Sequence, residues 1–269
     1  MQGKEIAGHA TKTLTVAAVV AVLAVSLTAR AETPAPVCDT PLELIRFANP
    51  LSHFGQKLQS GAPITVVAIG SSSTAGVGAS SPAKNYPNQL AVELRKRFPA
   101  NSFVVINRGV NGEEVADMLK RFDEAVIAAK PDLVLWQLGT NSVVRDHMFT
   151  DHGAAIRGGL KRIRTIGAET ILIDPQFVPR VIAKGEAEHM VELIAATAKL
   201  ENVELYRRFE VMKRWHDVDH IAFESFVSPD GLHLNDWSYT CMAHGLALAI
   251  AEAAQRPVMS ATAAAHLLP

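Results

Sequence analysis

The chain has 269 residues, of which 48% are hydrophobic and 20% are charged. It is therefore long and apolar enough to bury a full core, and its length fits one α/β domain or a tight two-domain protein, of which we expect the first. The formal net charge is −1 at pH 7. This near balance excludes the basic composition typical of nucleic-acid-binding proteins, so we expect no nucleic-acid partner. The sequence predicts no particular oligomeric state.

The N-terminus has the three parts of a signal peptide. A short basic start precedes an uncharged apolar run from Leu14 to Leu27, and Ala29-Arg30-Ala31 follows with small residues at the usual cleavage positions. We expect cleavage near Ala31 and a periplasmic or secreted mature protein. A permanent membrane anchor is the alternative, but the apolar run is shorter than the roughly 20 residues that a spanning helix needs.

Four regions follow from composition. We predict a signal peptide at 1–31, a Pro-rich linker with a first helix at 32–62, an α/β domain at 63–256 and an Ala-rich C-terminal tail at 257–269. No later segment is long enough to span a membrane, so we expect no stable membrane span after cleavage.

Apolar runs alternate with helical patterns through the predicted domain. The runs are short, rich in Val, Ile and Leu, and lack apolar/polar alternation, as expected for strands that are buried on both faces. Strands are predicted at Ile64–Ile69, Phe103–Asn107, Leu133–Leu138, Thr170–Asp174 and Val203–Tyr206. Helices are predicted at Tyr86–Phe98, Glu113–Ala129, Thr150–Ile166, Glu186–Leu200 and Asn235–Ala254. This order predicts a mostly parallel sheet with helices on both faces and ligands at the carboxyl ends of the strands.

A turn of small residues, Gly70-Ser71-Ser72-Ser73-Thr74-Ala75-Gly76, directly follows the first predicted strand. A serine in such a turn can present its hydroxyl to a substrate. The alternatives are an ordinary Ser/Gly loop or a phosphate-binding loop. The second alternative is disfavoured because no lysine appears until Lys84, whereas the P-loop pattern ends in Gly-Lys-Ser/Thr.

Near the other end, Asp230 lies three residues before His233 in the loop Ser228-Pro229-Asp230-Gly231-Leu232-His233-Leu234-Asn235. An aspartate can bind one imidazole nitrogen and leave the other free to take a proton from a hydroxyl. Local capping by Asp230 with an exposed His233 is the alternative.

Two further elements follow strands two and three. Asn107-Arg108-Gly109-Val110-Asn111-Gly112 makes the Gly112 amide available as a donor, and Gly139-Thr140-Asn141 supplies a side-chain amide. Each element alone is typical of a turn.

Together, the elements Gly-x-Ser, Gly, Gly-x-Asn and Asp-x-x-His occur in the order found in the SGNH/GDSL hydrolases, and the chain resembles that family from about Ile64 to Ile250. The resemblance implies a flavodoxin-like α/β/α sandwich around a five-stranded parallel sheet in order 2-1-3-4-5. It also implies Ser72 as nucleophile, His233 as base and Asp230 as the residue that orients it. The oxyanion hole would consist of the Ser72 amide, the Gly112 amide and the Asn141 side chain, without a metal ion or organic cofactor.

The chain departs from the family pattern at two positions. Ser71 replaces the usual acidic residue before the nucleophile, and Ser142 stands where many members have aspartate. Neither position belongs to the implied triad, so the departures affect the expected loop rigidity and subfamily. Ser71 and Ser73 also become rival nucleophiles, although Gly70 and Thr74-Ala75-Gly76 align the motif on Ser72.

The two cysteines, Cys38 and Cys241, both fall in the predicted mature chain. An exported protein permits a disulfide between them. Two buried free thiols are the alternative, because the sequence does not show how far apart the two Cα atoms lie.

Two stretches outside the four motifs are candidates for the rim of the site. Asp174 to Arg180 follows strand four, and Gln176, Phe177 and Arg180 are its candidates for substrate contact. A connector stiffened by Pro175 and Pro179 is the favoured alternative. Trp215 to His220, with Phe223 and Phe226, precedes the Asp230 loop, and we expect this stretch to line the substrate pocket. Packing in the core is the alternative. His216 and His220 are spaced for zinc on a helix, but the glutamate of the H-E-x-x-H pattern is absent, so we expect no metal site.

The sequence thus predicts an exported serine esterase acting on a small-molecule or polysaccharide ester, with short acyl groups such as O-acetyl on carbohydrate as the expected substrates. A lipase or thioesterase for longer acyl chains is one alternative. A catalytically silent carbohydrate-binding protein of the same fold is another, and a metal-dependent deacetylase using His216 and His220 is a third.

Overall fold

The computed structural model of this protein describes residues 1, 37–147 and 151–257. The predicted leader, apart from Met1, lies outside the described residues, as do residues 32–36 of the predicted linker and 258–269 of the predicted tail. The description below concerns the folded part, from residue 37 onward.

Five parallel strands form one sheet in the order β2-β1-β3-β4-β5. The strands are β1 (Ile64–Gly70), β2 (Phe103–Gly109), β3 (Leu133–Gln137), β4 (Glu169–Ile173) and β5 (Glu204–Tyr206). The predicted strand positions and the order 2-1-3-4-5 are confirmed. β3 is buried at every residue, whereas the edge strand β2 exposes Val104, as expected for its position.

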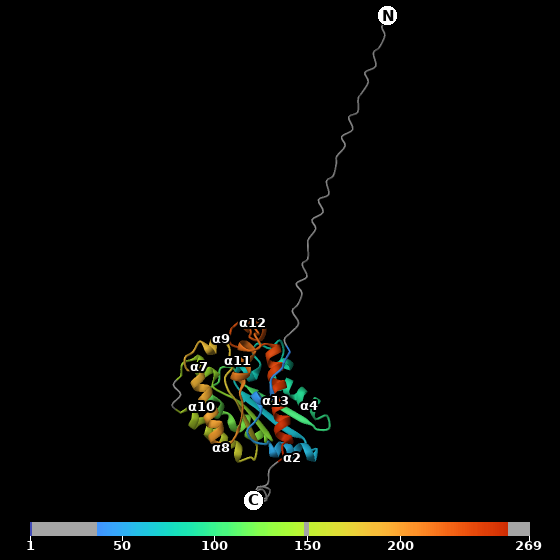
Figure 1. Ribbon diagram of the computed structural model, residues 1–269, viewed down its shortest axis with the longest axis vertical. Helices are drawn as coiled ribbons and strands as arrows, with labels where there is room; N and C mark the ends of the chain where they lie inside the picture. The colour runs from blue at the N-terminus through green and yellow to red at the C-terminus, as the bar shows by residue number, and fades with distance from the viewer. Residues whose placement is uncertain (2–36, 148–150, 258–269) are drawn as a thin grey trace, which may run out of the picture. The chain divides into compact units, whose positions relative to one another are not determined.

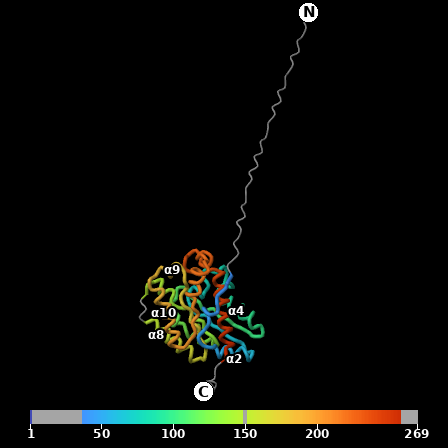
Figure 2. The backbone as a smooth tube through the Cα atoms, viewed as in Figure 1, coloured from blue at the N-terminus to red at the C-terminus, as the bar shows by residue number. Residues whose placement is uncertain are grey.

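Helices cover both faces of the sheet. Figures 1 and 2 show α2 (Ser52–Ser60), α4 (Tyr86–Arg97) and α13 (Asp236–Gln255) on one side, and α8 (His152–Arg164) and α10 (Ala187–Leu200) on the other. The predicted α/β/α sandwich is therefore confirmed. The shorter helices are α1 (Leu42–Ile45), α3 (Ser72–Ala75), η1 (Pro82–Lys84), α5 (Val115–Lys120), α6 (Phe122–Ala125), η2 (Ile127–Ala129), α7 (Thr140–Val144), α9 (Pro179–Ile182), α11 (Arg208–Asp217) and α12 (Phe223–Phe226).

Local sequence signals explain the ends of the long helices. Asn85 caps α4 by accepting a hydrogen bond from the Asn88 amide, and Asn235 caps α13 in the same way with the Ser238 amide. Leu90 and Leu94 give α4 a buried stripe toward the sheet.

The single helix predicted over Glu113–Ala129 is wrong. The structure divides this stretch into α5, α6 and η2, with a break at Arg121, whose guanidinium binds Glu113 and the Arg108 carbonyl. Buried residues nevertheless keep helical spacing across the break, at Val115, Met118, Phe122 and Ala125. The apolar period therefore does not reveal the break. The helix predicted from Thr150 begins at His152, and Thr150 itself lies outside the described residues.

A disulfide joins Cys38 to Cys241 on α13, with 5.1 Å between their Cα atoms. It ties the first described residues to the last helix. The same N-terminal segment adds Ile45, Phe47 and Phe54 to the hydrophobic core, so residues 37–62 pack as part of the folded unit.

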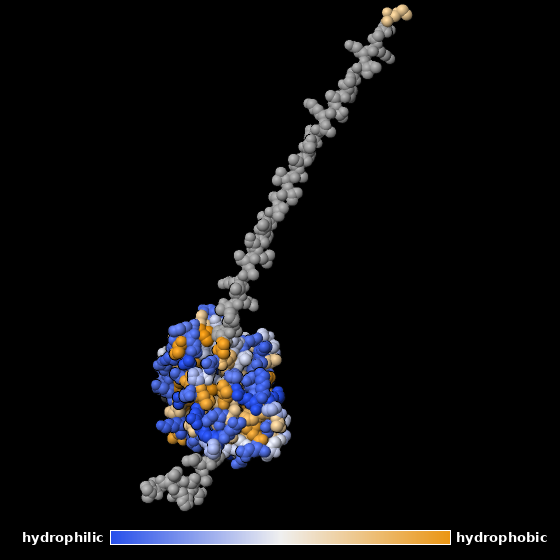
Figure 3. Space-filling view, turned by 45° about the vertical axis from the view of Figure 1, so that its right-hand side comes forward, coloured by the Kyte–Doolittle hydropathy of each residue, from blue (hydrophilic) through white to orange (hydrophobic). Residues whose placement is uncertain are grey.

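The surface of the folded part is mixed. The face in Figure 3 is largely hydrophilic, with smaller hydrophobic areas between. Exposed apolar side chains among the described residues from 37 onward are spread along the chain, at Val37, Leu42, Val92, Val104, Val110, Ile182, Leu200 and Val218. Within the described ranges, no helix combines the length and the apolar character needed to cross a bilayer.

Candidate active site

The turn between β1 and α3 places Ser72 at the carboxyl end of the sheet. Gly70 permits this tight turn, because a Cβ atom there would lie only 2.2 Å from Thr74 Oγ1. α3 begins at Ser72 itself, and the residue is 9% exposed. The Gly-x-Ser spacing thus results from a close approach between the strand end and the first turn of the helix.

The two neighbouring serines point elsewhere. Ser71 donates both its amide and its hydroxyl to Gln137 Oε1, at 2.9 and 3.0 Å. Ser73 is 1% exposed, and its hydroxyl has no partner among the described residues. The hydrogen bonds to Gln137 also fix the position at which the family usually has an acidic residue.

His233 lies between Ser72 and Asp230. Its Nε2 is 2.8 Å from Ser72 Oγ, and its Nδ1 is 2.5 Å from Asp230 Oδ2. The loop that carries both residues is closed by an antiparallel bridge between Val227 and Leu234. These contacts form an unbroken hydrogen-bonded chain from carboxylate to imidazole to hydroxyl, which is the arrangement that activates a serine.

The surroundings of Asp230 favour its charged form. Partial burial opposes ionisation, but hydrogen bonds from the backbone and ring of His233 and from the Leu232 amide outweigh it, so the pKa of Asp230 lies below its usual value. Asp230 therefore remains a carboxylate at neutral pH and can hold a proton on His233 Nδ1.

The backbone amides of Ser72 and Gly112, in the turns after β1 and β2, are candidate hydrogen-bond donors to a substrate. Gly112 adopts a positive φ of 79°, a conformation that glycine adopts readily. Within the described part of the chain, the amides of Ser72 and Gly112 have no hydrogen-bond partner. Asn141 directs its side-chain nitrogen to the Glu113 carbonyl at 2.8 Å, which uses one of its two N–H groups.

Glu114 holds the Gly112 loop to the Asn141 turn, a role that the sequence reasoning missed. Its carboxylate accepts hydrogen bonds from Ser142 at 2.9 Å, Arg145 at 2.8 Å and His147 at 2.9 Å. Burial opposes its ionisation, but these bonds outweigh burial, and the pKa of Glu114 is lowered. Ser142 thus makes an internal contact at the position where many family members have aspartate. The capping spacing of Glu114 and Asp117 was the available sequence signal.

Three of the residues expected to contact substrate are buried. Gln176 and Phe226 are 0% exposed and Phe177 is 9% exposed. Phe177 packs edge-on against Phe209, and Phe226 packs against Trp215. These side chains pack against the core, and their contacts with substrate remain a prediction.

The helical zinc pair also fails on geometry. His216 lies on α11, but the helix ends at Asp217 and His220 adopts a left-handed conformation beyond it. His216 instead stacks on Phe223, with 4.2 Å between ring centroids. Within the described ranges, no three His, Cys, Asp or Glu side chains group in a way that could hold a metal ion.

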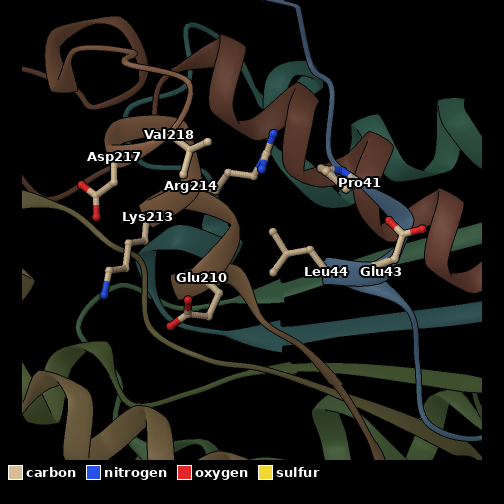
Figure 4. Close-up of a pocket in the computed structure, with 8 residues that line it drawn as sticks. All are labelled: Pro41, Glu43, Leu44, Glu210, Lys213, Arg214, Asp217 and Val218. Atoms are coloured by element: carbon tan, nitrogen blue, oxygen red, sulfur yellow. The ribbon is translucent and has the colours of Figure 1, made fainter.

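Two cavities help to locate the substrate. One of about 460 Å³ lies between α1 and α11 and is lined by charged side chains such as Glu43, Glu210 and Lys213 (Figure 4), but by none of the candidate site residues. The second, of about 440 Å³, is lined by Phe223 and Gly231 among others and borders the Asp230 loop. Of these two cavities, the second is therefore the one that lies beside the loop of Asp230 and His233.

Comparison with known proteins identifies the family of the chain. The sequence model of the non-GDSL lipase-like family matches residues 37–256. An acetylxylan esterase from Geobacillus stearothermophilus is 30% identical over 95 residues, which cover 32% of this chain and 43% of that protein.

Solved structures share the fold. A two-domain esterase active on acetylated mannans is similar with a TM-score of 0.68 at 18% identity, over 80% of this chain and 57% of that one. TesA is similar with a TM-score of 0.60 at 20% identity, over 70% of this chain and 99% of its own. The chain thus covers less than two thirds of both the acetylxylan esterase and the mannan esterase.

Proposed function

The chain belongs to the non-GDSL lipase-like family, an SGNH/GDSL-type hydrolase group, and on that basis we propose that it hydrolyses carboxylic esters with Ser72 as the nucleophile. The observation that carries the proposal is the hydrogen-bonded chain from Asp230 through His233 to Ser72 Oγ. A hydroxyl is a weak nucleophile unless an adjacent base takes its proton, and this chain supplies that base.

In the acylation step, His233 Nε2 takes the proton of Ser72 while Oγ forms a bond to the ester carbonyl carbon. Asp230 keeps the other ring proton on Nδ1 and stabilises the imidazolium that results. The tetrahedral intermediate then collapses: the bond to the alcohol oxygen breaks, and His233 Nε2 returns the proton to the leaving alcohol. The product of this step is an acyl group on Ser72.

Deacylation repeats the sequence with water. His233 removes a proton from water as the water oxygen attacks the acyl carbon. The bond between that carbon and Ser72 Oγ then breaks, His233 returns the proton to Oγ, and the carboxylic acid leaves. In both steps the negative charge on the carbonyl oxygen is stabilised by the amides of Ser72 and Gly112 and by the Asn141 side chain. The unpartnered amides described above support this role, since such donors need no rearrangement during the reaction.

We assign short acyl groups, such as O-acetyl on carbohydrate, as the substrates. The names of the acetylxylan esterase and of the esterase active on acetylated mannans support this assignment. The cavity beside Gly231 and Phe223 borders the loop of His233, which must protonate the leaving alcohol. This cavity is therefore our candidate position for the alcohol part of the ester.

The protein is proposed to act after export. The leader pattern before Ala31 supports export, and so does the Cys38–Cys241 disulfide, because disulfides persist in oxidising compartments. N-terminal sequencing of the protein recovered outside the cytoplasm is expected to begin at Glu32. A mature chain that begins at Met1 would contradict this part of the proposal.

Covalent labelling tests the nucleophile. A fluorophosphonate is expected to modify Ser72, as read by peptide mapping, and Ser72→Ala is expected to lose both labelling and hydrolysis of an aryl acetate. Ser73→Ala is the matched control, because it removes a neighbouring buried hydroxyl that has no described partner. Full activity in Ser72→Ala, or a label on another residue, would overturn the proposal.

A chain-length series tests the substrate class. The family's description as lipase-like makes longer acyl chains the competing substrates. We expect kcat/KM to be highest for acetate and to fall toward octanoate. A preference for octanoate would replace the acetylesterase with a lipase or thioesterase while leaving the serine mechanism intact.

A further inference from the structure

Gln176 bridges two parts of the proposed catalytic machinery. Its Nε2 donates to the carbonyl of Leu232 at 3.2 Å, and its Oε1 accepts from Thr140 Oγ1 at 2.8 Å. Leu232 directly precedes His233, and Thr140 directly precedes Asn141. One buried side chain thus connects the loop of the base to the turn of an oxyanion donor.

The direction of these hydrogen bonds is fixed by chemistry. The Leu232 carbonyl can only accept, so the nitrogen of the Gln176 amide must face it and the amide oxygen must face Thr140. The single hydroxyl hydrogen of Thr140 then points to Gln176. A lone pair of Thr140 Oγ1 therefore remains for a donor on the opposite side.

Arg208 supplies that donor. Its Nη2 lies 3.4 Å from Thr140 Oγ1, its Nε donates to the Asp174 carbonyl at 2.9 Å, and the residue is 1% exposed. Burial lowers the pKa of Arg208 to about 10, partly offset by the nearby Asp174, so the guanidinium is still charged at neutral pH. These hydrogen bonds form one chain, called the relay below, which runs from Arg208 through Thr140 and Gln176 to the Leu232 carbonyl. The cation at its first end orients every hydrogen bond of the relay in the same direction.

We propose that Thr140 and Gln176 are positioning residues, which use the relay from Arg208 to set the distance between His233 and Asn141. The inference rests on the proposed function, because it assigns a role relative to that reaction. A shift of about 1 Å between reacting groups can lower a rate by about 100-fold. Breaking the relay would also leave the Gln176 oxygen and the Arg208 nitrogen buried without a partner, which favours movement of one of the two loops.

The test compares Thr140→Val, which keeps the shape and loses the hydroxyl, with Thr140→Ser, which keeps the hydroxyl. We expect Thr140→Val to lower kcat on an aryl acetate by about 10- to 100-fold, with KM within about twofold, and Thr140→Ser to stay near wild type. Thr197→Val is the matched control, since it removes a buried hydroxyl that, among the described residues, donates to the Leu193 carbonyl of its own helix. We expect that control to leave kcat unchanged.

A double mutant tests whether the relay acts as one unit. Gln176→Met is expected to lower kcat as Thr140→Val does, and the double variant is expected to be no worse than the poorer single variant. Additive losses would overturn the proposal. So would a folded Thr140→Val with kcat within twofold of wild type, or a Thr140→Ser as impaired as Thr140→Val.

Folding failure is also decisive. If Thr140→Val does not fold, Gln176→Met is judged by the same criteria, and if neither folds the relay is structural and the proposal is overturned. Ser72→Ala, measured in parallel, separates the two hypotheses. An active Ser72→Ala would refute the proposed function itself, whereas an inactive Ser72→Ala beside a fully active Thr140→Val would refute only the positioning role.

Discussion

The two ends of the sheet both gather polar side chains, but they use them differently. α7, α9 and α12 lie at the end toward which the strands point, the upper end in Figure 1, and α2 lies at the opposite end. At the lower end, the Glu169 carboxylate accepts hydrogen bonds from the amides of His53 and Phe54. The Asp132 carboxylate accepts a hydrogen bond from the Thr65 amide and forms an ion pair with the Lys57 ammonium. Both carboxylates there use both of their oxygens.

The upper end differs in what it leaves available. His233 is bound on both sides, yet the Ser72 and Gly112 amides have no partner within the described residues. A dense polar cluster alone therefore does not indicate a reactive site. The informative feature is a set of amide donors without partners beside a hydroxyl that is hydrogen-bonded to an imidazole, and the predictions below test that contrast.

The largest effect is expected from Asp230→Asn. The variant keeps an oxygen for the Leu232 and His233 amides, but its NH₂ group faces His233 Nδ1 and forces the proton onto Nε2, so the base can no longer accept from Ser72. We expect kcat to fall by about 10³–10⁴-fold with little change in melting temperature. A loss below tenfold would show that the carboxylate does not set the tautomer of the base.

Asn141→Ala is expected to have the next largest effect. Removing one oxyanion donor typically lowers kcat by about 10²–10³-fold, with a small effect on KM. Asn101→Ala is a matched control, because the Asn101 side chain also donates to a backbone carbonyl, that of Leu58, away from the site. Equal effects of the two variants on kcat would argue against an oxyanion role for Asn141.

The two ends of the sheet should also differ in how pH changes the free energy of unfolding. Asp174 is buried at the carboxyl end of β4. Burial raises its pKa to about 7, so between roughly pH 4 and pH 7 the folded protein holds a proton that the unfolded chain has lost. The free energy of unfolding then falls as pH rises through this window. Chemical denaturation should show the advantage of wild type over Asp174→Asn shrinking by roughly 2–4 kcal/mol from pH 4 to pH 7.5.

Asp132 at the opposite end should show the reverse trend. Burial opposes its ionisation, but hydrogen bonds from Thr65, His53 and Lys57 outweigh it and lower the pKa of Asp132. Its contribution is therefore present near neutral pH and is lost as pH falls through that lowered value. Asp132→Asn should thus reduce stability more at pH 7 than at pH 3, and parallel pH curves for the Asp174 and Asp132 variants would contradict both assignments.

The elements that the sequence predicted well are those set by local pattern. Continuous apolar runs predict the buried strands, and the parallel order predicts that Ser72 and the Asn141 turn lie at the same end of the sheet. In the structure Ser72 and the Asn141 turn both directly follow the carboxyl ends of strands of this sheet, β1 and β3. Motif spacing is informative here because each motif directly follows a strand whose end is fixed by the core.

Side-chain direction beyond the motifs could not be predicted. Gln176 follows β4 at the correct end of the sheet, yet it turns inward because Thr140 and Leu232 offer it partners there. Those partners lie 36 and 56 residues away along the chain. The break at Arg121 was hidden for a similar reason, since the bonds that stabilise it reach Glu113 and Arg108 outside the helix.

The smallest effect is expected at the lower end, from Glu169→Gln. The two oxygens of the Glu169 carboxylate each accept a hydrogen bond from a backbone N–H in the first turn of α2, at 3.0 Å. The glutamine has one oxygen for one of these N–H groups, and its NH₂ group would face the other. We expect the free energy of unfolding to drop by about 1–2 kcal/mol. Turnover on an aryl acetate should stay within about twofold of wild type at a temperature where both proteins are folded. A tenfold loss of kcat would mean that the position of α2 influences the Ser72 turn through β1, and the functional distinction between the two ends of the sheet would no longer hold.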